Sequence, residues 1–309
     1  MRVSTFTDTL AAGPVVLDGG LGTLLEQRGH DLSSSLWSAR LLLEAPGKIR
    51  RAHAEYFAAG ARVAIASSYQ VSYEALGAEG YRRAEVDDLL ASSVRLAREA
   101  RDDAGLSAGE AWVAASVGPY GASLADGSEY TGDYGLDVEQ LRRWHRPRIR
   151  ALAAAAPDVL AVETLPSLAE LEAVCLELEG IGVPAWISMT VAGGGLRSGE
   201  SLTEAAAIAG SPTEVVAVGV NCCDALEVGS ALAMLGAGSK KPGVAYPNSG
   251  EDWIAEERRW SGEASRISQL AGEWLAGGAG LVGGCCRVGP DQIAQIARAV
   301  SAARRHGAA

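Results

Sequence analysis

Lysine is scarce in this sequence: it occurs only at positions 48, 240 and 241 of 309 residues. Acidic residues outnumber basic ones by 38 to 27, and the formal net charge is −11. A chain with this charge and without a basic patch is a poor partner for phosphate backbones and anionic lipid. We therefore expect neither a nucleic-acid partner nor a membrane partner.

Long apolar runs and a regular cysteine pattern are also missing. No run of apolar residues reaches the roughly 18 that a transmembrane helix needs, and the N-terminal segment is too short and polar for a signal peptide. Four of the five cysteines form two pairs of adjacent residues, which rarely bridge without strain. We expect a protein of the reducing cytoplasm whose cysteines are metal ligands or buried thiols.

Short runs of β-branched and apolar residues recur along the chain, and amphipathic helical patterns such as 46–60, 167–180 and 289–305 separate them. The expected strands span residues 15–18, 62–66, 112–117, 159–163, 184–190, 215–220, 243–246 and 281–284. This alternation favours parallel strands joined by right-handed crossovers, and eight such units fit a (β/α)8 TIM barrel.

A doubly wound open sheet is the less favoured fold. Its dinucleotide fingerprint needs a helix that starts at the first strand–helix turn, and the DGGLGT turn at 18–23 lacks that pattern. No linker-like stretch divides the chain. We therefore expect one domain over residues 1–309, with its core at about 13–305.

Four cysteines follow two of the expected strands. In a (β/α)8 barrel the active site forms at the C-terminal ends of the strands. Cys222 and Cys223 follow the sixth strand, and Cys285 and Cys286 follow the eighth. Adjacent side chains on a strand point to opposite faces, so a pair converges only where the strand has ended. We expect Gly283–Gly284 to permit that turn through a positive φ and a close backbone approach.

Two sulfurs from the eighth strand and at least one from the sixth would form a three-thiolate cluster with one open position. This is the arrangement of a catalytic zinc site, and thiolates favour Zn²⁺ over Mg²⁺ or Ca²⁺. The pattern does not choose between Cys222 and Cys223. The alternative is that these are buried thiols of an alanine-rich core, which is how we interpret Cys175 on its helix.

The segments GVNC at 219–222 and GGCC at 283–286 resemble the homocysteine S-methyltransferase family. Further matching segments are LDGGLGTLLEQRG (17–29), LWSARLL (36–42), SSYQ (67–70), DGSEYTGDY (126–134), ETLPS (163–167) and YPNSGE (246–251). The resemblance runs from about Val15 to Ala297. DGSEYTGDY and YPNSGE are similar to the branch that uses S-methylmethionine or S-adenosylmethionine.

The resemblance implies a zinc site and a homocysteine site. In the family pattern the zinc ligands correspond to Cys222, Cys285 and Cys286, which act by activating the substrate thiol. The turn that binds the amino-acid end of homocysteine corresponds to Asp18, Gly19 and Gly20, and the acid that pairs with its α-amine corresponds to Glu163.

Four further residues are candidate substrate contacts. Relatives commonly carry a hydroxyl residue at the position of Ala66, and here Ser67 and Ser68 follow it. Asn221 belongs to the GVNC motif at the end of the sixth strand. Tyr130 lies in the long segment 118–136, where we expect its ring and that of Tyr134, with the carboxylates of Glu129 and Asp133, to receive a sulfonium cation. The alternative for that segment is a solvated loop.

The expected activity is zinc-dependent transfer of a methyl group from S-methylmethionine or S-adenosylmethionine to homocysteine, giving methionine. Both substrates are small molecules, and we expect a monomer or a small homo-oligomer. Three thiolates give the zinc site a net charge of −1, which attracts a cationic donor. The alternatives are a betaine-dependent enzyme, a zinc hydrolase and a non-catalytic metal or thiol sensor. Three thiolates leave zinc a weak Lewis acid, which disfavours the hydrolase.

Overall fold

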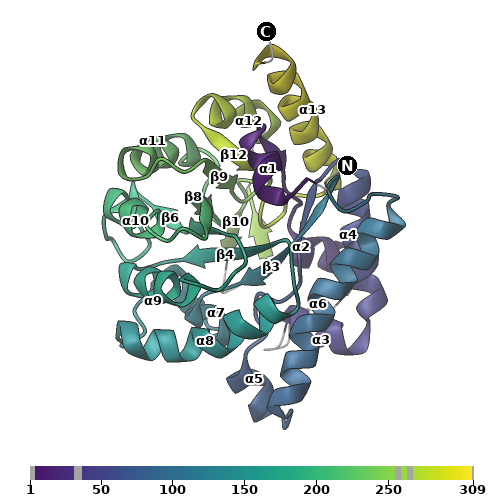
Figure 1. Ribbon diagram of the computed structural model, residues 1–309, viewed down its shortest axis with the longest axis vertical. Helices are drawn as coiled ribbons and strands as arrows, with labels where there is room; N and C mark the ends of the chain where they lie inside the picture. Colours follow the sequence, from purple (N-terminus) through teal and green to yellow (C-terminus); the bar gives the residue numbers. More distant parts are fainter. Residues whose placement is uncertain (1–3, 31–36, 255–258, 263–266, 308–309) are drawn as a thin grey trace.

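The computed structural model describes residues 4–30, 37–254, 259–262 and 267–307, so Leu36 of the LWSARLL segment lies outside the described residues. Its central sheet has eight strands in the order β1-β12-β9-β8-β5-β4-β3-β2, all paired in parallel. A parallel bridge between Leu17 and Val63 joins the two ends of this order. The predicted (β/α)8 barrel is therefore confirmed (Figure 1).

The barrel strands agree with the expected segments to within two residues at each end. They are β1 (Val15–Val16), β2 (Val63–Ile65), β3 (Trp112–Val117), β4 (Val159–Leu165), β5 (Ala185–Met189), β8 (Val215–Asn221), β9 (Gly243–Tyr246) and β12 (Ala279–Val282). Two hairpins were not expected: β6 (Val191–Ala192) with β7 (Gly195–Leu196), and β10 (Asp252–Ile254) with β11 (Arg259–Ser261). Their strands are too short to show a periodic pattern.

Helices cover the outside of the barrel. They are α1 (Phe6–Ala11), α2 (Leu21–Gln27), α3 (Trp37–Glu44), α4 (Pro46–Ala58), α5 (Tyr73–Ala78), α6 (Arg83–Asp103), α7 (Tyr120–Leu124), α8 (Val138–Ala154), α9 (Leu168–Leu178), α10 (Leu202–Ala209), α11 (Val228–Gly238), α12 (Ile267–Ala276) and α13 (Pro290–Gly307), with a 3₁₀ turn η1 (Ser128–Tyr130). The long segment 118–136 is thus partly helical. No helix in the described ranges has the length and apolarity needed to cross a membrane.

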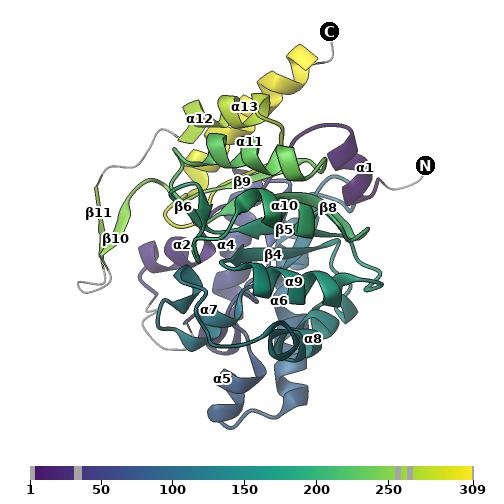
Figure 2. The same cartoon turned by 90° about the vertical axis from the view of Figure 1, so that its left-hand side faces the viewer.

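The N-terminal helix α1 closes one end of the barrel. Its Phe6 ring lies 6.2 Å from the ring of Trp112 and 6.0 Å from that of Trp186, both of which are buried inside the barrel. Figure 2 shows α1 on one side of the barrel and the β10–β11 hairpin on the other. Because α1 fills the end where the strands begin, the opposite end is left for a site.

Candidate active site

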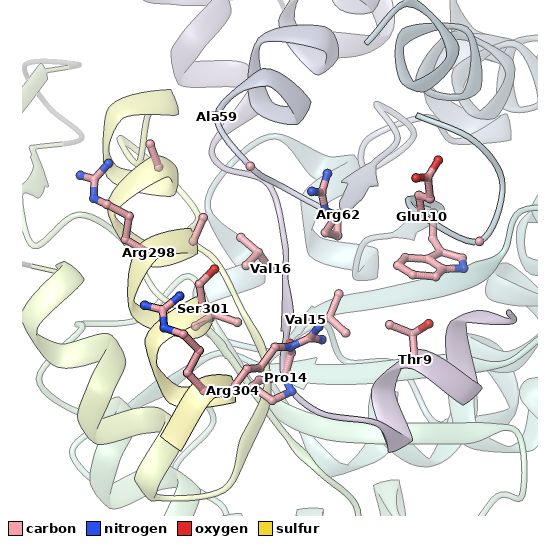
Figure 3. A pocket seen from close by; sticks show the side chains of 17 residues that line it. Thr9, Pro14, Val15, Val16, Ala59, Arg62, Glu110, Arg298, Ser301 and Arg304 are labelled. Carbon is pink, nitrogen blue, oxygen red and sulfur yellow. The ribbon is translucent and has the colours of Figure 1, made fainter. Parts of the chain in front are cut away.

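A cleft of about 810 Å³ lies beside α1 at the end of the barrel where the strands begin, between β1 and α13. Figure 3 shows Arg62, Arg298 and Arg304 along its walls, beside Val15 at the start of β1. Active sites of (β/α)8 barrels lie at the opposite end. None of the residues selected from the sequence lines this cleft, so we place the candidate site elsewhere.

Three cysteine sulfurs meet at the other end. Cys222 follows the last residue of β8, and Cys285 and Cys286 follow β12. Their Sγ atoms all lie within 4.8 Å of one another, and those of Cys285 and Cys286 are 4.0 Å apart. Cys223 is fully buried and takes no part in the cluster. The structure thus selects Cys222, a choice that the pattern of residues left open.

Cys222 and Cys285 are directly paired through their Sγ atoms, as in a disulfide, with Cα atoms 5.6 Å apart. The sequence analysis expected these cysteines to be metal ligands or buried thiols and did not expect a bridge between them. The pairing joins residues 63 positions apart in the chain. It brings together the ends of β8 and β12, which are separated in the sheet by β9.

The backbone turns that aim these sulfurs differ from the expected ones. The left-handed residues are Cys222 itself, with φ 49°, and Arg287, with φ 66°. Gly283 and Gly284 do not have positive φ, so that part of the prediction was wrong. Gly283 instead permits close approach, because a Cβ atom there would lie 2.7 Å from the carbonyl oxygen of Asp18.

The YPNSGE segment after β9 holds both cysteine segments by hydrogen bonds. The Asn248 N–H donates to the carbonyl oxygen of Cys223 at 3.0 Å, and its Oδ1 accepts from the Cys286 N–H at 3.2 Å. The Cys285 N–H donates to the Pro247 carbonyl oxygen at 2.7 Å. The loop between the two cysteine-bearing strands therefore fixes the relative positions of their sulfurs.

The Asp18-Gly19-Gly20 turn packs against the same cluster. A Cβ atom at Gly20 would lie 2.5 Å from the Cys285 carbonyl oxygen, so only glycine fits there. The buried Asp18 carboxylate accepts from the Ile65 N–H at 2.8 Å and from the Tyr246 hydroxyl at 3.0 Å. Burial raises the pKa of Asp18 well above its usual range. Asp18 thus ties β2 and β9 to the turn, and Tyr246 is a site residue that the sequence analysis did not select.

Glu163 lies near the end of β4 and is almost fully buried. The Ser116 hydroxyl donates to its Oε1. Burial raises the pKa of Glu163 to about 7, while the Ser116 hydrogen bond and the charge of Arg148 oppose the rise. The carboxylate therefore changes its charge near neutral pH.

Thr164, directly after Glu163, has a left-handed backbone with φ 65°. The Thr164 N–H donates to Asn221 Oδ1 at 2.7 Å, and Asn221 Nδ2 donates to Thr164 Oγ1 at 2.7 Å. The amide of Asn221 is therefore engaged with Thr164, and it fixes the backbone beside Glu163.

The two serines after β2 differ in their hydrogen bonds. The Ser68 hydroxyl donates to the Ser116 carbonyl oxygen at 2.7 Å. The buried Ser67 hydroxyl has no partner among the residues that the structure describes. Arg148 of α8 reaches this loop: its guanidinium donates to the Tyr69 carbonyl oxygen at 2.6 Å and to that of Gly118 at 2.9 Å. Nothing in the sequence around Arg148 indicated this contact.

Tyr130 and Glu129 come from the 3₁₀ turn between β3 and α8. Tyr130 is 37% exposed, and the pKa of its hydroxyl is raised by burial and then by the charge of Cys286, so it lies near the cysteines. The Oε2 atom of Glu129 is buried and has no partner in the described ranges, and burial raises the pKa of its carboxyl. The structure therefore brings a ring and a carboxylate from this segment toward the cysteine cluster.

The comparisons with known proteins agree with one another. The family model described as homocysteine S-methyltransferase matches residues 15–300. A curated relative, homocysteine S-methyltransferase 4 of Zea mays, is 45% identical, and the match covers 94% of this chain and 90% of the relative.

Two solved structures are of the homocysteine methyltransferase MmuM from Escherichia coli. Its metallated form has a TM-score of 0.83 and 40% identity, covering 93% of this chain and 96% of the other. Its oxidized form has a TM-score of 0.83 and 41% identity, and the match covers 92% of this chain and 94% of the other.

Proposed function

Because this chain belongs to the homocysteine S-methyltransferase family and is an enzyme of that kind, we propose that it methylates homocysteine with a sulfonium donor, S-methylmethionine or S-adenosylmethionine, at a zinc site. The observation that carries the proposal is the meeting of three cysteine sulfurs, from the ends of β8 and β12, within 4.8 Å of one another. We propose that the reaction takes place in the cytoplasm, where thiols stay reduced.

The cysteine cluster fits a zinc ion. In the reduced protein, with the sulfur pair of Cys222 and Cys285 opened, Cys222, Cys285 and Cys286 offer three soft ligands, and a fourth position remains for the sulfur of homocysteine. When bound there, zinc supplies the chemistry that keeps a coordinated thiol in its nucleophilic thiolate form. The backbone contacts from the segment after β9 hold the three ligands in place without using their sulfurs.

Homocysteine would extend from the cysteine cluster toward β4 and β2. Glu163 would pair with its α-ammonium, and the free hydroxyl of Ser67 would donate to its carboxylate. The Asp18-Gly19-Gly20 turn would line the same pocket, since it packs directly on Cys285. These contacts orient the substrate so that its sulfur and the donor methyl meet in line.

The donor would enter beside Tyr130. The ring of Tyr130 and the buried carboxylate of Glu129 present negative electrostatic potential to a sulfonium cation. During transfer a bond forms between the homocysteine sulfur and the methyl carbon, and the electron pair of the breaking bond leaves with the donor sulfur. The positive charge of the donor and the negative charge of the thiolate disappear together. Exclusion of water strengthens the attraction between them.

The proposal is tested by measuring metal content and methionine formation together. Wild type, Cys285→Ser and Cys175→Ser are purified with zinc, and their metal content is measured by mass spectrometry. Methionine formation from homocysteine is then measured with S-methylmethionine, S-adenosylmethionine and betaine offered separately. Cys175 lies on α9 outside the cluster, so its variant is the control.

We expect wild type and Cys175→Ser to hold one zinc and to use a sulfonium donor, and Cys285→Ser to lose both properties. A Cys285→Ser variant that keeps its zinc and its turnover would overturn the assignment of the metal site. Zinc-loaded wild type that uses only betaine would overturn the choice of donor.

A further inference from the structure

Arg197 and Tyr130 lie against each other, and both come from segments beside the candidate site. The guanidinium carbon of Arg197 lies 5.6 Å from the centre of the Tyr130 ring. Arg197 directly follows β7, and Tyr130 belongs to the turn η1. The two segments meet at Pro166: the Ser198 N–H donates to its carbonyl oxygen at 3.1 Å, and a Cβ atom at Gly132 would lie 3.3 Å from its side chain.

The backbone of Arg197 is linked to the cysteine cluster through a single residue. The Arg197 N–H donates to the Thr190 carbonyl oxygen at 3.2 Å, and the Thr190 hydroxyl donates to the Cys222 carbonyl oxygen at 3.2 Å. The backbone of Arg197 is therefore linked to Cys222 through Thr190, and its exposed side chain lies against the Tyr130 ring.

A fixed positive charge at this place conflicts with a site that admits a sulfonium cation. Two cations at close range repel each other. No carboxylate in the described part of the chain forms an ion pair with Arg197, and its contact with the Tyr130 ring leaves its N–H groups free. The repulsion is offset if the donor carries a carboxylate that pairs with this guanidinium, since a carboxylate accepts two parallel hydrogen bonds from the guanidinium N–H groups.

We propose that Arg197 binds the α-carboxylate of the methyl donor and so restricts the site to sulfonium compounds that are also amino acids. This inference rests on the proposed function and extends it to donor selection. Tyr130 and Glu129 would take the cationic part of the donor, and Arg197 would take the anionic part. Neutral or purely cationic sulfonium compounds would meet an unpaired guanidinium.

The test compares two donors that differ only in the carboxylate: S-methylmethionine and its α-carboxamide. Wild type, Arg197→Met, Arg197→Lys and the control Arg150→Met are assayed for methionine formation at saturating homocysteine. Arg150 is an exposed residue near the C-terminal end of α8, which leads into the start of β4 and away from the strand ends where the candidate site lies. Calorimetric binding of S-methylmethionine is measured on the same four proteins.

For Arg197→Met we expect the KM for S-methylmethionine to rise about 10- to 100-fold, as for the loss of a charged hydrogen-bonded pair. The KM for the carboxamide should stay constant or fall, because the repulsion is removed. The KM for S-methylmethionine of Arg197→Lys should lie between the values of wild type and Arg197→Met. The KM values of Arg150→Met should match those of wild type. A merely structural role would change the KM of both donors together.

The outcomes separate this inference from the proposed function. Equal changes for both donors, or none for either, overturn the role of Arg197 while methyl transfer stands. Arg197-dependent binding of S-methylmethionine, without formation of methionine from it or from S-adenosylmethionine, supports the carboxylate contact and overturns the proposed function. Wild type that does not bind S-methylmethionine and forms methionine from neither sulfonium donor overturns both.

Discussion

Thr164, Cys222 and Arg287 have left-handed backbones and all lie at the mouth of the barrel, with φ of 65°, 49° and 66°. A non-glycine residue in this conformation costs about 1–3 kcal/mol, and such strain persists where the surroundings fix it and gathers at functional sites. Thr164 is held by two hydrogen bonds to Asn221. Each of the three is either a candidate site residue or directly follows one, so the strained turns aim the side chains that the proposed chemistry needs.

Glu163 leads to a prediction about pH. Its raised pKa, about 7, means that the free enzyme loses the carboxylate charge as the pH falls through neutrality. If this charge pairs with the ammonium of homocysteine, kcat/KM for homocysteine should decrease about tenfold per pH unit below pH 7. Glu163→Gln should lower kcat/KM at pH 8 by about 10- to 100-fold, and its kcat/KM should no longer decrease in this way below pH 7. Steady-state kinetics between pH 5.5 and 8.5 measure both effects.

The pH dependence of the free energy of unfolding provides an independent check, because the raised pKa of Glu163 fixes the sign of the expected change. Between pH 4.5 and about 7 the folded protein keeps the proton on Glu163 that the unfolded chain releases. The contribution of this group to the free energy of unfolding therefore falls as the pH rises through that window. Glu163→Gln should lose less stability than wild type over the same range in denaturant titrations. Parallel pH profiles of the two proteins, in kinetics and in unfolding, would contradict the assigned pKa and role.

The residues that could be predicted from the sequence are those whose place along the chain determines their place in the barrel. Strand ends meet at one face of a barrel, so the cysteines after β8 and β12 and Glu163 near the end of β4 could be expected at that face, but the choice between Cys222 and Cys223 could not be made from the pattern. Arg148 could not be predicted, because it reaches the mouth from the middle of α8 through a long side chain. Arg197 could not be predicted either, since its place depends on a hairpin of two-residue strands.

The helix α1 illustrates how an element outside the strand–helix alternation supports the barrel. Its capping box at Thr5 and Asp8 satisfies the first turn, and its buried Phe6 and Leu10 face the barrel interior. Phe6 packs against two tryptophan rings from β3 and β5. The helix thus completes the core at the end where the strands begin, which is the end that serves stability in this fold.

Phe6→Ala should therefore destabilise the protein without changing the chemistry. We expect a loss of about 3–5 kcal/mol in the free energy of unfolding, as for other buried phenylalanines. Zinc content and kcat should stay at wild-type values at temperatures where the variant is folded. Leu176→Ala, at a 37% exposed position on α9, is the matched control and should lose about 0.5 kcal/mol or less. A fall in kcat or zinc content of folded Phe6→Ala would show that α1 acts on the site.

The elements themselves were predictable to different degrees for a physical reason. Strand β3 is six residues long and buried throughout, and β8 is seven residues long and buried at all but one position, so their apolar runs stand out. The β6–β7 and β10–β11 hairpins have strands of two or three residues and no run to detect. The helix η1 lies in a polar segment whose order comes from packing, with Gly121 against the Glu129 backbone.

The barrel as a whole would couple metal binding at the candidate site to folding. The three cysteines follow β8 and β12, which lie on either side of β9, and the loop after β9 binds both cysteine segments. A metal ion held by all three sulfurs would therefore cross-link β8 and β12 across β9. Because an unfolded chain lacks this arrangement, metal binding adds directly to the free energy of unfolding.

Removal of zinc should consequently lower the melting temperature. At zinc concentrations 100- to 1,000-fold above Kd, binding contributes about 3–4 kcal/mol, which corresponds to a shift on the order of 5–10 °C. Calorimetry of chelator-treated and zinc-reloaded protein, kept reduced throughout, measures the shift. Cys175→Ser should show the same shift as wild type, and Cys285→Ser should show almost none. Equal shifts in wild type and Cys285→Ser would mean that zinc stabilises the protein from another place, and the cross-link between β8 and β12 would then have no part in it.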